Sequence, residues 1–112
     1  MPLLKKPKML HWTNHSHAKM RHYGLSEARV KRILHTPGRI EEGIAPETVA
    51  FMQTAGSKKH PYELWVMVQD VGAKRRVISA WRYPGQTKAN RPLPSAVLRQ
   101  LRELVQEGAA AE

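Results

Sequence analysis

The chain has 112 residues, enough for one small domain, and its 41% hydrophobic and 25% charged residues are typical of a globular protein. Nineteen lysines and arginines against nine acidic residues give a net charge of +10, which favours a polyanionic partner such as nucleic acid. The absence of cysteine excludes disulfides and thiolate chemistry, and the longest apolar run, Leu64 to Val68, is too short to span a bilayer. We therefore expect a cytoplasmic protein that does not associate with a membrane.

Two helices are predicted in the first third of the chain, after a basic lead-in formed by residues 1–12. Thr13 or Asn14 can cap the first helix, which should end before Gly24. Ser26 is expected to cap the second helix, because a serine at this position accepts a hydrogen bond from the first turn. The apolar residues behind it recur at helical spacing, and a Pro-Gly pair ends the helix.

The middle of the chain changes to the apolar period of two that is typical of strands. Earlier in the chain, Leu10 and Trp12 flank a polar residue and suit either a short strand or a segment that covers a sheet edge. Strands are predicted over residues 47–54, 61–70 and 74–83, and residues 39–42 can form a short edge strand. Because short turns join consecutive strands, we expect an antiparallel sheet.

A final helix is predicted over residues 95–107, because Ser95 can cap it and five apolar residues form a stripe along one side. These residues are Val97, Leu98, Leu101, Leu104 and Val105. The expected organisation is a single domain over residues 13–107, followed by a tail over residues 108–112. The predicted fold class is α+β, with two N-terminal helices, an antiparallel sheet of three to four strands, and a C-terminal helix.

The region of the two predicted helices carries a distinctive series of residues: His17-Ala18, Arg21, Gly24-Leu25-Ser26, Val30, Ile33-Leu34 and Pro37. This series resembles the opening of a small bacterial domain family of unknown function that is grouped with the RelE/BrnT type of toxin ribonuclease. The resemblance covers about residues 12–84 and implies a RelE-like layout. In toxins of that layout, basic residues and a tyrosine near the last strands act on RNA without a metal. Arg82 and Tyr83 match these by type and place, whereas the toxins' lysine pair has no clear counterpart.

RNA that is cleaved by its own 2′-hydroxyl needs a base for that hydroxyl, an acid for the leaving 5′-oxygen, and cations on the phosphate. Arg82 offers a planar fork for the phosphate, and Tyr83 can donate a proton or stack on a base. Since neighbours in a strand point to opposite faces, these two converge only at a bulge or a strand end. His17 is either a general acid or base, or a buried histidine that packs the first helix on the sheet.

Four further cations are candidates for phosphate contacts. Lys58 and Lys59 lie in the predicted loop between two strands, Arg76 lies near the next turn, and Arg21 lies in the first predicted helix. If the strands are adjacent and antiparallel, the lysine pair and Arg76 occupy opposite ends of the sheet. Only one of these groups can then join Arg82 along a phosphate backbone.

Four histidines, at positions 11, 15, 17 and 22, fall close together, but Glu27 is the nearest acidic residue. A metal-binding protein would require these histidines to converge, and we predict no metal and no other cofactor. We expect an RNA-binding protein of the RelE/BrnT toxin-like type. It would act either as a metal-independent endoribonuclease or as a non-catalytic module that binds nucleic acid or a protein. An antitoxin-like protein is a further candidate partner, and both a monomer and a dimer remain open.

Overall fold

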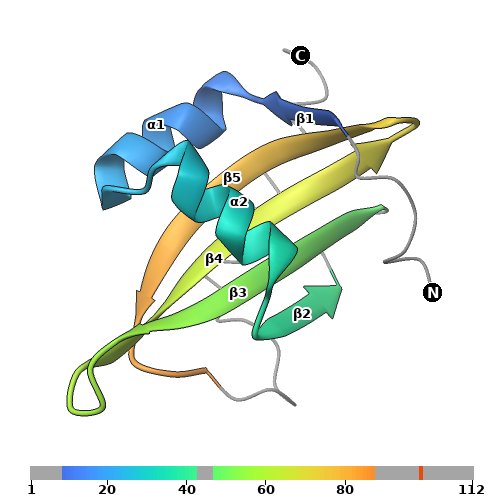
Figure 1. Ribbon diagram of the computed structural model, residues 1–112. Helices are drawn as coiled ribbons and strands as arrows, with labels where there is room; N and C mark the ends of the chain where they lie inside the picture. Colours follow the sequence, from blue (N-terminus) through green and yellow to red (C-terminus); the bar gives the residue numbers. More distant parts are fainter. Residues whose placement is uncertain (1–8, 43–46, 88–98, 100–112) are drawn as a thin grey trace.

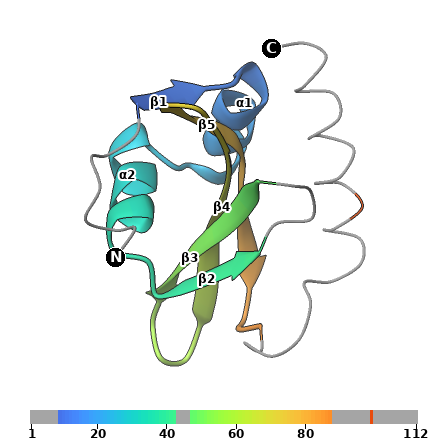
Figure 2. The same ribbon diagram turned by 90° about the vertical axis from the view of Figure 1, so that its right-hand side faces the viewer.

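The computed structural model describes residues 9–42, 47–87 and 99, and shows a five-stranded sheet with two helices (Figure 1). The elements in chain order are β1 Met9–Trp12, α1 Asn14–Tyr23, α2 Glu27–His35, β2 Arg39–Glu42, β3 Thr48–Gly56, β4 Pro61–Val71 and β5 Lys74–Pro84. Across the sheet the order is β1-β5-β4-β3-β2. Strands β2 to β5 pair antiparallel, whereas β1 lies parallel to β5. Figure 2 shows both helices on the same face of the sheet.

The ends of the helices are set by local hydrogen bonds. The Thr13 hydroxyl accepts from the N–H of Ser16 at 3.1 Å and donates to the carbonyl oxygen of Val77 at 2.8 Å, so the cap of α1 is also tied to β5. Ser26 caps α2 in the same way. Gly24 ends α1 with a φ of 69°, in the left-handed region that glycine favours. Neither of the two described helices is long and apolar enough to cross a membrane.

The main core lies between the helices and the sheet. Val30 and Ile33 of α2 are fully buried, and Met20 of α1 is 4% exposed. They pack on the side chains that β3, β4 and β5 direct to this face, namely Phe51, Leu64, Val66, Val68, Val77 and Ala80. Burying these apolar side chains holds both helices on the sheet, because removing apolar surface from water is the main favourable contribution to folding.

A second apolar cluster lies on the opposite face of the sheet. Its buried members are Ala50, Met52, Trp65, Met67, Ile78 and Trp81. The rings of Trp65 and Trp81 are stacked, with centroids 5.7 Å apart and planes at 3°. The central strand β4 is therefore apolar on both faces, as its sequence indicates.

The predicted RelE-like architecture is wrong in its sheet. The sheet has five strands and is mixed, not antiparallel with three to four strands, because residues 9–12 of the predicted lead-in form a strand parallel to β5. This pairing joins residues about 65 positions apart in the chain, a non-local contact that local periodicity does not report. The described elements include two helices, both preceding β2. The predicted helix over residues 95–107 is not among them and, apart from Arg99, lies outside the described residues.

Candidate nucleic-acid interface

The β3–β4 hairpin and the end of β5 place three of the predicted phosphate-binding residues at one end of the sheet. The N–H of Gly85 donates to the carbonyl oxygen of Pro61 at 3.0 Å, which joins the chain after β5 to the start of β4. Lys58 and Lys59 lie in the exposed loop just before β4, and Arg82 lies near the end of β5. The hairpin loop and the end of β5 lie together at the lower left of Figure 1.

Gly56 fixes the shape of the hairpin loop. It has a φ of +83°, and a Cβ atom there would lie 2.4 Å from the carbonyl oxygen of His60 and 2.9 Å from the ring of Tyr62. Only glycine fits both requirements. The hydroxyl of Ser57 accepts a hydrogen bond from the N–H of His60 at 3.0 Å, which closes the loop. The backbone of the loop therefore holds the lysine pair at the tip of the hairpin.

Two contacts hold Arg82 on the helix side of the sheet. Its Nη2 donates to the carbonyl oxygen of Tyr23 at 3.0 Å, and its guanidinium lies over the ring of Tyr62, 4.8 Å from the centroid. The carbonyl belongs to the C-terminal end of α1, where the helix dipole favours a cation. The side chain is exposed and forms no ion pair with a described carboxylate. Since a guanidinium carries five N–H donors, most of them remain free for a ligand.

His17, Arg82 and Tyr83 were the catalytic candidates of the sequence analysis, and the structure does not bring them together. Tyr83 packs beside the tryptophan cluster on the other face of the sheet and lies opposite Glu63 in the register. Arg82, one residue before it, faces the helices. His17 contacts neither of them and lies on α1. A phosphate that is bound by Arg82 is therefore on the wrong side of the sheet for Tyr83.

His17 lies at the surface between the two helices and not in the core. Its Nε2 is 3.0 Å from Oε2 of Glu27, the first residue of α2, and its ring stacks on Trp12 with centroids 5.7 Å apart. The two side chains of the pair are 38% and 49% exposed. Arg21 follows one helical turn later on α1 and is exposed, so it shares this face of the helix.

The other histidines do not form a metal site with His17. In residues 9–42 and 47–87, no group of three or more histidine and acidic side chains is close enough to hold a metal ion. His22 instead contacts the ring of Tyr23 edge-on, at 4.7 Å between centroids. The metal-binding hypothesis therefore has no geometric support in this part of the chain.

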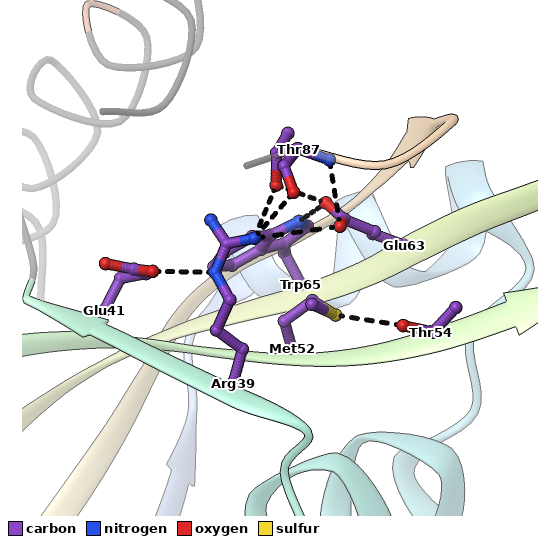
Figure 3. A network of polar contacts seen from close by, with 7 residues as sticks. All are labelled: Arg39, Glu41, Met52, Thr54, Glu63, Trp65 and Thr87. Atoms are coloured by element: carbon purple, nitrogen blue, oxygen red, sulfur yellow. Dashed lines mark hydrogen bonds and ion pairs between the residues drawn. The ribbon is translucent and has the colours of Figure 1, made fainter. Parts of the chain in front are cut away.

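A buried polar network occupies the face of the sheet opposite the helices (Figure 3). The carboxylate of Glu63 is 2% exposed and accepts from Nε1 of Trp65 at 3.0 Å and from the N–H and hydroxyl of Thr87 at 3.0 and 2.7 Å. Arg39 donates to Glu41 at 2.7 Å and to Thr87, and its guanidinium lies 5.0 Å over the ring of Trp65. Because Glu63 is already fully engaged within the protein, we regard this network as structural: it ties β2 and β4 to the chain after β5.

The acidic residues leave the cations at the hairpin end without ion pairs. Arg75 pairs with Asp70 at 2.8 Å, and Arg39 pairs with Glu41 and approaches Glu63. Arg76 donates to Gln69 and lies six residues from Arg82, or roughly 20 Å along the strand at about 3.3 Å per residue. Among the described residues, no ion pair involves any of the cations Lys58, Lys59, Arg82 and Arg21. The lysine pair, and not Arg76, therefore joins Arg82.

An open pocket of about 320 Å³ lies at the base of the hairpin. Its lining combines apolar surface from Ala55, Gly56 and Pro61 with the hydroxyl, ammonium and amide groups of Thr54, Ser57, Lys58 and Gln86. These groups can donate to or accept from the polar edge of a small planar ligand, such as an unpaired base. The pocket and the cations of the hairpin occupy the same end of the sheet.

The sequence interpretation missed three residues that contact the candidate site residues Arg82 and His17. Tyr62 supports Arg82, and Trp12 and Glu27 hold the imidazole of His17. Tyr62 alternates with Leu64 on the helix side of β4, a signal that could have been read from the period of two. The contact between α1 and α2 depends on how the helices pack, which periodicity alone does not give.

The sequence matches no protein-family model, and no match was found among the curated proteins or the solved structures. The functional conclusion therefore rests on the geometry, the charge distribution and the residue pattern.

Proposed function

We propose that the protein binds single-stranded RNA through its hairpin surface, which we define as Lys58, Lys59, Tyr62 and Arg82. The observation that carries the proposal is that Lys58, Lys59 and Arg82 lie exposed at this end of the sheet and form no ion pair with a described carboxylate, whereas Arg39 and Arg75 are paired with carboxylates elsewhere. Cations that are not neutralised within the protein attract phosphates and release the counterions condensed on the nucleic acid. The net charge of +10 acts in the same direction.

Two features favour unpaired RNA over a duplex. The arginine–tyrosine stack of the hairpin surface and the adjacent open pocket suit bases that are free to leave a stack. The proposed relationship to the RelE/BrnT-related family, through the series from His17 to Pro37, also favours RNA. A protein that acts on RNA in this way would work in the cytoplasm.

RNA cleavage without a metal is a second candidate function, and the contact between His17 and Glu27 favours it. The alternative is a non-catalytic binding module on the same surface. The two differ in a simple observation, since only the enzyme shortens a bound RNA when a chelator is present. The predicted antitoxin-like protein partner stays a prediction.

Binding of a fluorescent single-stranded RNA, followed by anisotropy, tests the proposal. In the double variant Lys58→Ala/Lys59→Ala, affinity should fall about 25-fold at about 0.1 M salt, because counterion release contributes roughly fivefold per cation under these conditions. The matched control is Lys31→Ala/Lys74→Ala, which removes the same charge from exposed positions on α2 and at the start of β5. Equal losses in both double variants would show that net charge alone drives binding and would refute the hairpin surface.

A further inference from the structure

The imidazole of His17 is fixed on two sides. Trp12 stacks on its plane at an interplanar angle of 14°, and Glu27 contacts Nε2 at 3.0 Å. Among the described residues, Nδ1 makes no hydrogen bond, although the side chain is more than a third exposed. One nitrogen is thus held by a carboxylate while the other remains free to meet a ligand.

The carboxylate decides which nitrogen carries the proton. A carboxylate only accepts hydrogen bonds, so in the neutral imidazole the proton lies on Nε2 and the lone pair on Nδ1. If Nδ1 then takes up a proton, the charge on Glu27 stabilises the imidazolium that results. This arrangement, a base held in one tautomer by a third group, is what a general base requires.

A cation for the phosphate lies beside this pair. Arg21 is four residues after His17 on α1, a spacing that puts their Cβ atoms roughly 6 Å apart on one face. It is exposed and forms no ion pair with a described carboxylate. An exposed arginine at this spacing can extend its guanidinium to the oxygens of a phosphate whose neighbouring 2′-hydroxyl reaches Nδ1.

From this arrangement we infer that His17 is a general base for RNA cleavage, with Glu27 as its positioning residue and Arg21 as the phosphate ligand. The inference rests on the proposed RNA binding and moves the chemistry from Arg82 and Tyr83 to α1. Nδ1 takes the proton of the 2′-hydroxyl, the 2′-oxygen attacks phosphorus, and the bond from phosphorus to the 5′-oxygen breaks. The leaving oxygen takes a proton from water, and the imidazolium returns its proton to water. The products are a 2′,3′-cyclic phosphate and a 5′-hydroxyl, with no oxidation or reduction.

The test uses a short single-stranded RNA labelled with a fluorophore and a quencher, in the presence of a chelator. The full chain should cleave it, and the all-2′-deoxy strand should stay intact. His17→Ala should slow cleavage by about 10²–10⁴-fold, as loss of a general base does. Glu27→Ala should slow it by about 10–100-fold, a usual cost of losing an orienting partner. The control His35→Ala removes an exposed imidazole from the last turn of α2 and should leave the rate unchanged.

Two further measurements test whether Glu27 positions the imidazole of His17 or only holds the two helices together. Nitrogen-15 NMR of the His17 ring should show the proton on Nε2 in the original chain and a mixture of tautomers in Glu27→Ala. RNA affinity, measured by anisotropy, should change by less than about fivefold in Glu27→Ala, the effect of one phosphate contact. A Glu27→Ala variant that melts at a lower temperature but cleaves at the original rate would refute the positioning role. RNA that is bound but not cleaved would refute the inference and leave RNA binding standing, whereas no binding would refute both.

Discussion

The dependence of RNA affinity on salt tests the number of phosphate contacts made by the hairpin surface. The surface holds three cations, Lys58, Lys59 and Arg82, none of which forms an ion pair with a described carboxylate. For a single strand each contact contributes about −0.7 to the slope of log affinity against log salt, so the three contacts of the hairpin surface contribute about −2.1. Between about 50 and 200 mM salt, these three contacts should account for a roughly 20-fold fall in affinity.

Removing two of these cations should flatten the dependence. In Lys58→Ala/Lys59→Ala the slope should become less steep by about 1.4, so the fall in affinity over the same range of salt should be about sevenfold smaller. The double variant Lys31→Ala/Lys74→Ala has the same net charge and should keep the slope of the original chain. Anisotropy titrations of a labelled RNA at three salt concentrations measure all three slopes. A flat curve for the original chain, or the same flattening in both double variants, would refute the assignment of the contacts to the hairpin.

Three further predictions concern stability. Glu63→Ala should lower the free energy of unfolding, measured by urea denaturation, by about 3–5 kcal/mol. The substitution removes one partner of the partly buried Arg39 and leaves three hydrogen-bond donors without their acceptor. A loss smaller than about 1 kcal/mol would contradict the structural role of this network. Gly56→Ala should lower the melting temperature more than Gly72→Ala does. A Cβ atom at position 56 meets the carbonyl oxygen of His60, whereas a Cβ atom at position 72 meets nothing within 4 Å. Equal melting temperatures of the two variants would contradict this reasoning. Ile33→Ala should cost about 2–5 kcal/mol as a cavity in the main core, again measured by urea denaturation.

The helices and most strand spans could be predicted because their signals are local. The cap at Ser26 and the apolar spacing behind it define α2, and alternation defines β2 at the same four residues, 39–42. The place of β1 could not be predicted in this way. Leu10 and Trp12 suit a strand, but its parallel pairing with β5 depends on a crossover through both helices and three strands. The mixed sheet follows from that one non-local contact.

The sequence predicted the cations of the hairpin surface but not the separation of Arg82 from Tyr83. The pairing of β5 with β4 explains this separation. Strand pairing with β4 shifts once, between Met67 and Val68, and is then regular from the pair of Met67 and Ser79 to the pair of Tyr62 and Pro84. The alternation of faces therefore persists through Arg82 and Tyr83. A strand end at Tyr83 would have allowed the two side chains to converge, but the strand ends one residue later. The same register places the lysine pair of the hairpin at the end of the sheet where Arg82 lies. The sequence alone did not decide whether the lysine pair or Arg76 shares that end.

The arginines of this chain show why total charge is a poor guide to where a polyanion binds. Arg39 and Arg75 are each held by a carboxylate, and both guanidiniums also lie over aromatic rings. Displacing these partners for a phosphate would leave a carboxylate unpaired, which opposes binding. Arg82 differs because its partners within the protein are a carbonyl oxygen and an aromatic face, neither of which carries a net charge. The position of Arg82 is therefore fixed while its charge is not neutralised. Because the side chain is already ordered by folding, binding an anion loses little further side-chain entropy. This combination suits an anion site.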